Sequence, residues 1–196
     1  MLDVYAGLIQ KQGRLKEAIV TQRKVTQIDP LKASAWTNLG AFLMQDGQLA
    51  AAREAYTRSQ EISPDNSGAA RFLAMIDLLE GHPANALPAM ETVPQEADRL
   101  MGVAIAHYEM GHARDSQQAL DALIKRADGP EGDTAYRIAS VRAWRGERDG
   151  AFEWLDRAYA RHDLMLRWIK IDPFLRNLRG DARYTVLVKK MNLPVD

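Results

Sequence analysis

The chain has 196 residues, of which 46% are hydrophobic and 27% are charged, a composition typical of one folded domain or one short repeat array. Its 26 basic and 26 acidic side chains cancel, so the overall charge favours neither a nucleic acid nor a membrane surface as partner. The absence of cysteine excludes disulfides, thiol catalysis and cysteine-ligated metal centres.

Glycines recur along the chain at steps of 34, 34, 30 and 35 residues, and a small side chain follows each glycine after five residues. A glycine adopts turn conformations that other residues resist, so it ends one helix and admits the next. The small residue lets the second helix pack closely against the first. The glycines are Gly13, Gly47, Gly81, Gly111 and Gly146, and the small residues are Ala18, Ala52, Ala86, Ser116 and Ala151.

Helical apolar spacing between these marks predicts a series of antiparallel helix pairs. Prolines close the first two pairs at Pro30 and Pro64, since the residue before a proline is disfavoured in a helix. In the third pair, Pro88 is expected to interrupt the second helix and Pro94 to end it. The predicted pairs are 1–12 with 14–29, 33–46 with 48–62, 67–80 with 83–93, 97–110 with 113–127, and 132–145 with 148–161.

These pairs predict a repeat domain over residues 1–161, with repeats at about 1–32, 33–66, 67–96, 97–131 and 132–161. Residues 128–133 read as a flexible, solvated connection; they lack the alternating ligands of a calcium loop. Residues 162–196 are expected to form a helical cap over the last repeat. In this cap, 162–170 reads as a short helix that Asp172-Pro173 breaks, and Asp181 caps a final helix. That helix carries one apolar face, formed by Tyr184, Leu187, Val188 and Met191.

The sequence resembles the tetratricopeptide repeat (TPR) family. The second unit matches through Trp36, Leu39, Gly40, Leu43, Ala52, Tyr56, Ser59 and Pro64; the first through Tyr5, Ala6, Ile9, Ala18, Val25 and Pro30; the fifth through Ile138, Ala139, Gly146, Ala151, Leu155 and Ala158. The resemblance implies an all-α, right-handed α-α superhelix of about five helix pairs. It also implies a protein-interaction module rather than an enzyme, with a protein or peptide as partner and no cofactor.

In this family the first helix of each pair lines a concave groove, so the resemblance also implies which side chains contact a ligand. Tyrosine, tryptophan and arginine among them are typical of binding hot spots. The candidates are Asn38, Gln45, Arg71, Met75, Met101, Tyr108, Tyr136, Arg137, Ser140 and Trp144.

The last segment is similar to the closing part of bacterial multidomain regulators, in which TPR repeats follow a cyclase, kinase or winged-helix domain. The similarity lies in residues 146–155 and in the Asp-Pro, Leu-Arg and Asp-x-Arg-Tyr steps. It implies an alternative function, as the C-terminal regulatory region of a larger bacterial protein. No polar helix precedes the first pair, so we also expect an exposed apolar edge there, which would allow self-association, and a chain that continues a longer protein.

Other chemistry has weak support in the sequence. His107 and His112 lie five residues apart, and Gly111 should end their helix between them, so no metal site is expected. The arginines and tryptophans of residues 137–168 are interleaved with acidic side chains, which argues against a nucleic-acid groove. With no membrane-spanning run and no secretory signal, the expected location is the cytoplasm.

Overall fold

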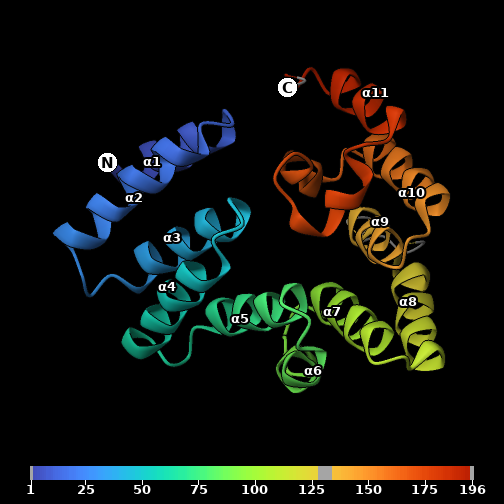
Figure 1. Cartoon of the computed structure of the whole chain (residues 1–196), viewed down its shortest axis with the longest axis horizontal. Helices are drawn as coiled ribbons and strands as arrows, with labels where there is room; N and C mark the ends of the chain where they lie inside the picture. The colour runs from blue at the N-terminus through green and yellow to red at the C-terminus, as the bar shows by residue number, and fades with distance from the viewer. Residues whose placement is uncertain (1, 128–133, 195–196) are drawn as a thin grey trace. The chain divides into compact units, whose positions relative to one another are not determined.

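The structure is a computed structural model that describes residues 2–127 and 134–194, and all regular secondary structure in those ranges is helical (Figure 1). The prediction of an all-α chain is confirmed. The chain divides into two compact units, residues 1–80 and residues 81–196, which we name the N-unit and the C-unit. Within the two described ranges, no helix has the length and apolarity that a membrane span requires.

The N-unit consists of helices joined by short turns. Gly13 and Gly47 adopt positive φ angles of 82° and 80°, and each reverses the chain between the helices of a pair, as the glycine spacing predicted. The helices are α1 (Leu2–Lys11), α2 (Leu15–Ile28), α3 (Ala33–Gln45), α4 (Leu49–Ile62) and α5 (Ser67–Leu79).

Small residues at the repeat positions allow the helices of the N-unit to approach closely. Ala18 and Ala52 are fully buried in the core. Gly40 on α3 lies directly under the ring of Tyr56 on α4, where an added Cβ would be 2.8 Å from the ring. The Tyr56 ring has no exposed surface and stacks on Phe72 at a centroid distance of 5.1 Å. This packing joins α3, α4 and α5 into one core.

The first helix exposes an apolar surface, as predicted from the sequence. Leu2, Val4, Tyr5 and Leu8 on α1 are between 43% and 78% exposed. Self-association through this edge stays a prediction.

The C-unit continues the helix pairs and ends in shorter turns. Its α-helices are α6 (Pro83–Glu91), α7 (Glu96–Glu109), α8 (Ala113–Ala127), α9 (Ala135–Trp144), α10 (Arg148–Ala160) and α11 (Ala182–Lys190). Two 3-10 helices, η1 (Leu164–Trp168) and η2 (Pro173–Leu178), lie between α10 and α11. The predicted connection at residues 128–133 lies outside the described residues.

One local prediction for the C-unit is wrong. Pro88 does not interrupt α6, which runs unbroken to Glu91. Proline cannot donate the hydrogen bond that residue 88 would give to Ala84, but one missing bond is tolerated in a helix that packs on α7. The short helix predicted over residues 162–170 is present as the 3-10 helix η1, which Asp163 caps and which spans only Leu164–Trp168.

The final helix forms as predicted. The Asp181 side chain accepts a hydrogen bond from the Arg183 N–H and caps α11. Tyr184, Leu187 and Val188 are buried along one face, whereas Met191 follows the end of the helix and is half-buried. Hydrogen bonds to Asp181 lower the pKa of this half-buried carboxyl to about 2, since Arg183 donates to it from both side chain and backbone.

Candidate functional site

The N-unit candidates on α3 lie in a row of polar side chains shared with α1. Asn38 donates a hydrogen bond from Nδ2 to Asp3 Oδ1 at 3.1 Å. Gln45 accepts one at Oε1 from Gln10 Nε2 at 2.8 Å. Both α3 side chains are half-buried. Asn38 and Gln45 are seven residues apart, so they lie on the same face of the helix, two turns from each other.

Asp3 is the centre of this row, and sequence reasoning did not select it. Its carboxylate also accepts hydrogen bonds from Lys32 Nζ at 2.9 Å and from Gln22 Nε2 at 2.9 Å. Partial burial acts to raise the pKa of Asp3, but the hydrogen bonds from Lys32, Gln22 and Asn38 outweigh it and hold that pKa below its ordinary value. The row is therefore a polar surface whose charge is balanced within the N-unit.

The Asp3 network predicts a pH dependence of stability. The pKa of Asp3 is lower in the folded than in the unfolded chain, so its contribution is present above the ordinary value of 3.8 and is lost as the pH falls through the folded pKa. We expect Asp3→Asn to lower Tm at about pH 6 and the difference from the unsubstituted chain to shrink below pH 3.8, measured by thermal unfolding followed by circular dichroism. Asp65→Asn, at an exposed carboxylate, is the matched control. A Tm difference that stays constant down to about pH 2.5 would contradict the assignment.

Arg71 and Met75 lie one turn apart on α5 of the same unit, and both are half-buried. The Arg71 guanidinium lies 4.4 Å above the Phe72 ring, which orients its charge. All four candidates predicted in the N-unit, including Asn38 and Gln45, are therefore partly accessible.

In the C-unit, three predicted ligand contacts are buried in the chain itself. Met101, Tyr136 and Ser140 are 5%, 2% and 0% exposed. The Ser140 hydroxyl donates to the Tyr136 carbonyl within α9. These three side chains are therefore packing residues in this structure, which corrects the expectation that they face a ligand.

Residues 172–177, which include most of η2, cover this part of α9. Tyr136 donates its hydroxyl hydrogen bond to Asp172 Oδ2 at 2.8 Å, just before η2. The Trp144 ring lies 5.4 Å from that of Phe174, and Asn177 Nδ2 donates to the Ala143 carbonyl. Asp172, Phe174 and Asn177 thus hold η2 along α9, at positions where the family pattern implies ligand contacts.

Burial changes the pKa values of the two side chains that make this contact. Burial raises the pKa of Asp172 above its ordinary value, although the hydrogen bonds from the Phe174 N–H and the Tyr136 hydroxyl oppose the rise. Burial, followed by the nearby Asp172 charge, raises the pKa of Tyr136 well above its ordinary value, so Tyr136 stays a donor. Asp163 adds a second anchor, because its Oδ2 accepts from the Tyr136 N–H at 3.1 Å.

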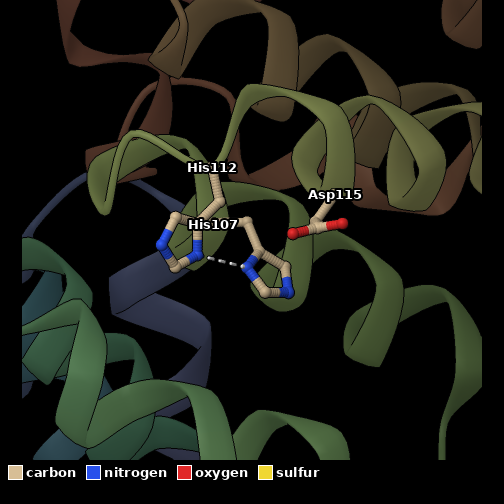
Figure 2. Close-up of side chains that lie close together, drawn as sticks. All are labelled: His107, His112 and Asp115. Carbon is tan, nitrogen blue, oxygen red and sulfur yellow. Dashed lines mark hydrogen bonds between the residues drawn. The ribbon is translucent and has the colours of Figure 1, made fainter.

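The remaining C-unit candidates link neighbouring helices. Arg137 forms an ion pair with Asp98 on α7, at 2.6 Å between Nε and Oδ1. Trp144 Nε1 donates to Glu109 at 2.7 Å, and the Tyr108 hydroxyl donates to the Arg145 carbonyl at 3.3 Å. Among them Tyr108 is the most accessible, at 39% exposed. One further group, His107, His112 and Asp115, places ligand atoms suited to a metal ion close together (Figure 2).

Comparison with known proteins gives a family for two segments. Two family models, both described as tetratricopeptide repeat, match residues 33–66 and residues 104–164. Among curated proteins, the chain is similar to the human protein O-mannosyl-transferase TMTC1, with 32% identity over 72 residues. That match covers 37% of this chain and 8% of TMTC1, so the chain spans less than a tenth of this relative.

Solved structures of TPR proteins share the fold. A TPR protein from Parabacteroides merdae matches with a TM-score of 0.64 and 15% identity, covering 97% of this chain and 76% of that one. YrrB matches with a TM-score of 0.52 and 18% identity, covering 96% and 90% of the two chains. MamA matches with a TM-score of 0.53 and 18% identity over 83% of this chain and 96% of its own. Identities this low show the fold alone. The structural matches confirm the predicted all-α, TPR-type fold class.

Proposed function

Since this chain belongs to the tetratricopeptide-repeat family, whose repeats serve as protein-interaction scaffolds, we propose that it holds an extended peptide segment of a partner along α3 and α5 of the N-unit. YrrB, a TPR protein with an unusual peptide-binding site, is a relative in fold that binds this class of ligand. The partner proposed for this chain is accordingly a peptide or an extended segment of a protein.

The observation that carries the proposal is the pair of half-buried amides on α3. Asn38 uses Nδ2 for Asp3, and Gln45 uses Oε1 for Gln10. Within the described residues, the Asn38 carbonyl oxygen and the Gln45 amino group make no hydrogen bond to the chain, so one acceptor and one donor remain for a ligand.

The spacing of these amides suits an extended peptide. Seven helical residues rise by about 10.5 Å. An extended strand covers the same length with about three residues at roughly 3.3 Å each. Asn38 and Gln45 can therefore bond to backbone groups three residues apart on one peptide. Met75 and Arg71 on α5 add an apolar and a cationic contact for its side chains.

The test is selection from a random linear peptide library on the whole chain, followed by calorimetry with the selected peptide. We expect Asn38→Ala combined with Gln45→Ala to weaken binding roughly ten- to a hundredfold, as two lost hydrogen bonds of about 1 kcal/mol each predict. Gln27→Ala removes the same kind of amide from an exposed site on α2 and is the matched control.

Two results would contradict the proposed peptide site on α3 and α5. One is a selected peptide whose affinity is unchanged in the double variant, with the helical content of the chain intact. The other is an equal loss of peptide affinity in the double variant and in Gln27→Ala, which would indicate a non-specific effect of amide removal.

The alternative function, as the C-terminal regulatory TPR region of a larger bacterial signalling enzyme or transcription regulator, rests on the motifs of residues 146–155 and of the tail. It is compatible with a groove in the N-unit, because the peptide could belong to the same polypeptide. An open reading frame that joins this sequence to a cyclase, kinase or winged-helix domain would distinguish it from a separate adaptor.

A further inference from the structure

The turn between α7 and α8 brings two histidine side chains close together. Gly111 adopts a φ of +76°, which reverses the backbone where α7 ends. The N–H of His112 then donates to the carbonyl of His107 at 2.9 Å. As a result the His112 ring lies beside that of His107, and the two Nδ1 atoms are 3.4 Å apart (Figure 2).

This separation matches the spacing of two ligands on one tetrahedral ion. Zinc binds imidazole nitrogen at about 2.0–2.1 Å, and two such bonds at a tetrahedral angle place the nitrogens about 3.3–3.4 Å apart. The rings also meet at a tilt, with an angle of 41° between their planes, rather than stacked face to face. Both Nδ1 lone pairs can therefore be directed at a point between the rings.

A third ligand comes from the first turn of α8. Asp115 lies three residues after His112, and one carboxylate oxygen of Asp115 and one ring nitrogen of each histidine all lie within 4.8 Å of one another. Ligand atoms around a tetrahedral zinc ion are about 3.3–3.5 Å apart, so the Asp115 carboxylate must move closer to the histidine nitrogens to complete such a site. Its side chain is exposed and can make this adjustment by rotation.

We propose that His107, His112 and Asp115 form a binding site for a divalent transition metal ion, with zinc as the ion that their geometry fits. Two imidazoles and a carboxylate complete three of four tetrahedral positions. The fourth position is open to water or to a side chain of a partner.

The site differs from the helical histidine pair with which the sequence was compared. In that motif both histidines project from one continuous helix, four residues apart. Here Gly111 ends the helix, and the reversal of the chain supplies the convergence that the helix would otherwise provide. Gly111, which argued against a metal site in the sequence analysis, is therefore the residue whose turn brings the ligands together.

Zinc titration of the whole chain, first treated with chelator, tests the proposal. At about pH 7.5 we expect one saturable zinc site per chain by calorimetry. His107→Ala and His112→Ala should each weaken zinc binding by at least about tenfold, and Asp115→Asn by a smaller factor. His162→Asn removes an exposed histidine from the C-unit and keeps a residue that tolerates its φ of 54°, so zinc affinity should be unchanged.

Imidazole nitrogen NMR gives a second, independent measurement. Zinc should shift the Nδ1 resonances of His107 and His112 together and leave those of His82 and His162 in place. A simple hydrogen bond between the two rings would instead show one protonated Nδ1 and no response to zinc, which would overturn the proposal. Zinc binding that survives His107→Ala with His112→Ala, in a variant of unchanged helical content, would overturn it equally.

Discussion

Tyr136→Ala is expected to lower the free energy of unfolding of the C-unit by about 3–5 kcal/mol, because it removes a fully buried aromatic ring from α9. It also removes the hydroxyl that holds Asp172 and, through it, η2. We therefore expect the effect to extend to residues 163–178, whose amides should lose protection together. Hydrogen exchange followed by mass spectrometry, in a urea series, measures the free energy of unfolding and the protection of these amides.

Tyr136→Phe separates the hydrogen bond from the ring. It keeps the packing and leaves the Asp172 carboxylate without one of its donors, so we expect a loss of about 1–3 kcal/mol. Tyr159→Phe is the matched control, since the Tyr159 hydroxyl donates to the Lys190 carbonyl in an exposed position and its removal should cost less than about 0.5 kcal/mol. Equal effects of the two Phe variants would show that the Tyr136–Asp172 bond does not anchor the tail.

Tyr56→Ala is expected to have a comparable effect on the N-unit, about 3–5 kcal/mol. The ring fills the space above Gly40 and stacks on Phe72, so its removal leaves a cavity among three helices. Hydrogen exchange of peptides from residues 2–80 follows this unit separately from the C-unit, whose stability should be unchanged.

Tyr56→Phe should act in the opposite direction from Tyr136→Phe. Among the described residues the buried Tyr56 hydroxyl has no hydrogen-bond partner, and burial raises its pKa far above the ordinary value. Removing an unsatisfied buried hydroxyl is expected to be neutral or stabilising by up to about 1 kcal/mol. A loss of more than 1 kcal/mol in Tyr56→Phe would mean that the hydroxyl is bonded in solution.

The two units differ in what their first helices offer to a partner. In the C-unit, η2 lies along α9 and uses Tyr136, Ala143 and Trp144 for internal contacts. In the N-unit, the candidates on α3 and α5 are half-buried, and the Asn38 and Gln45 amides on α3 each keep one group without a hydrogen bond to the described residues. This difference is why the proposed peptide site is assigned to the N-unit.

The sequence alone determined the helices and their ends. The spaced glycines, the small residues after them and the residues before Pro30 and Pro64 placed α1 to α5 and α7 to α10 within about three residues of their structural bounds. Asp181 likewise identified the start of α11. These signals are local: a turn conformation, a cap or a missing N–H depends on residues close together in the chain, so it can be read without the fold.

Only the tertiary structure decided which side chains meet. The pairs Tyr136–Asp172 and Asn38–Asp3 join residues 36 and 35 positions apart. Helical periodicity in the sequence does not predict contacts between residues so far apart. Arg71 on α5 is half-buried, whereas Tyr136 on α9 is buried because η2 lies along α9. His107 and His112 are close in sequence, yet their convergence required the backbone reversal at Gly111. A periodic sequence specifies the faces of its helices, whereas the chain that covers a face is chosen by packing between distant segments.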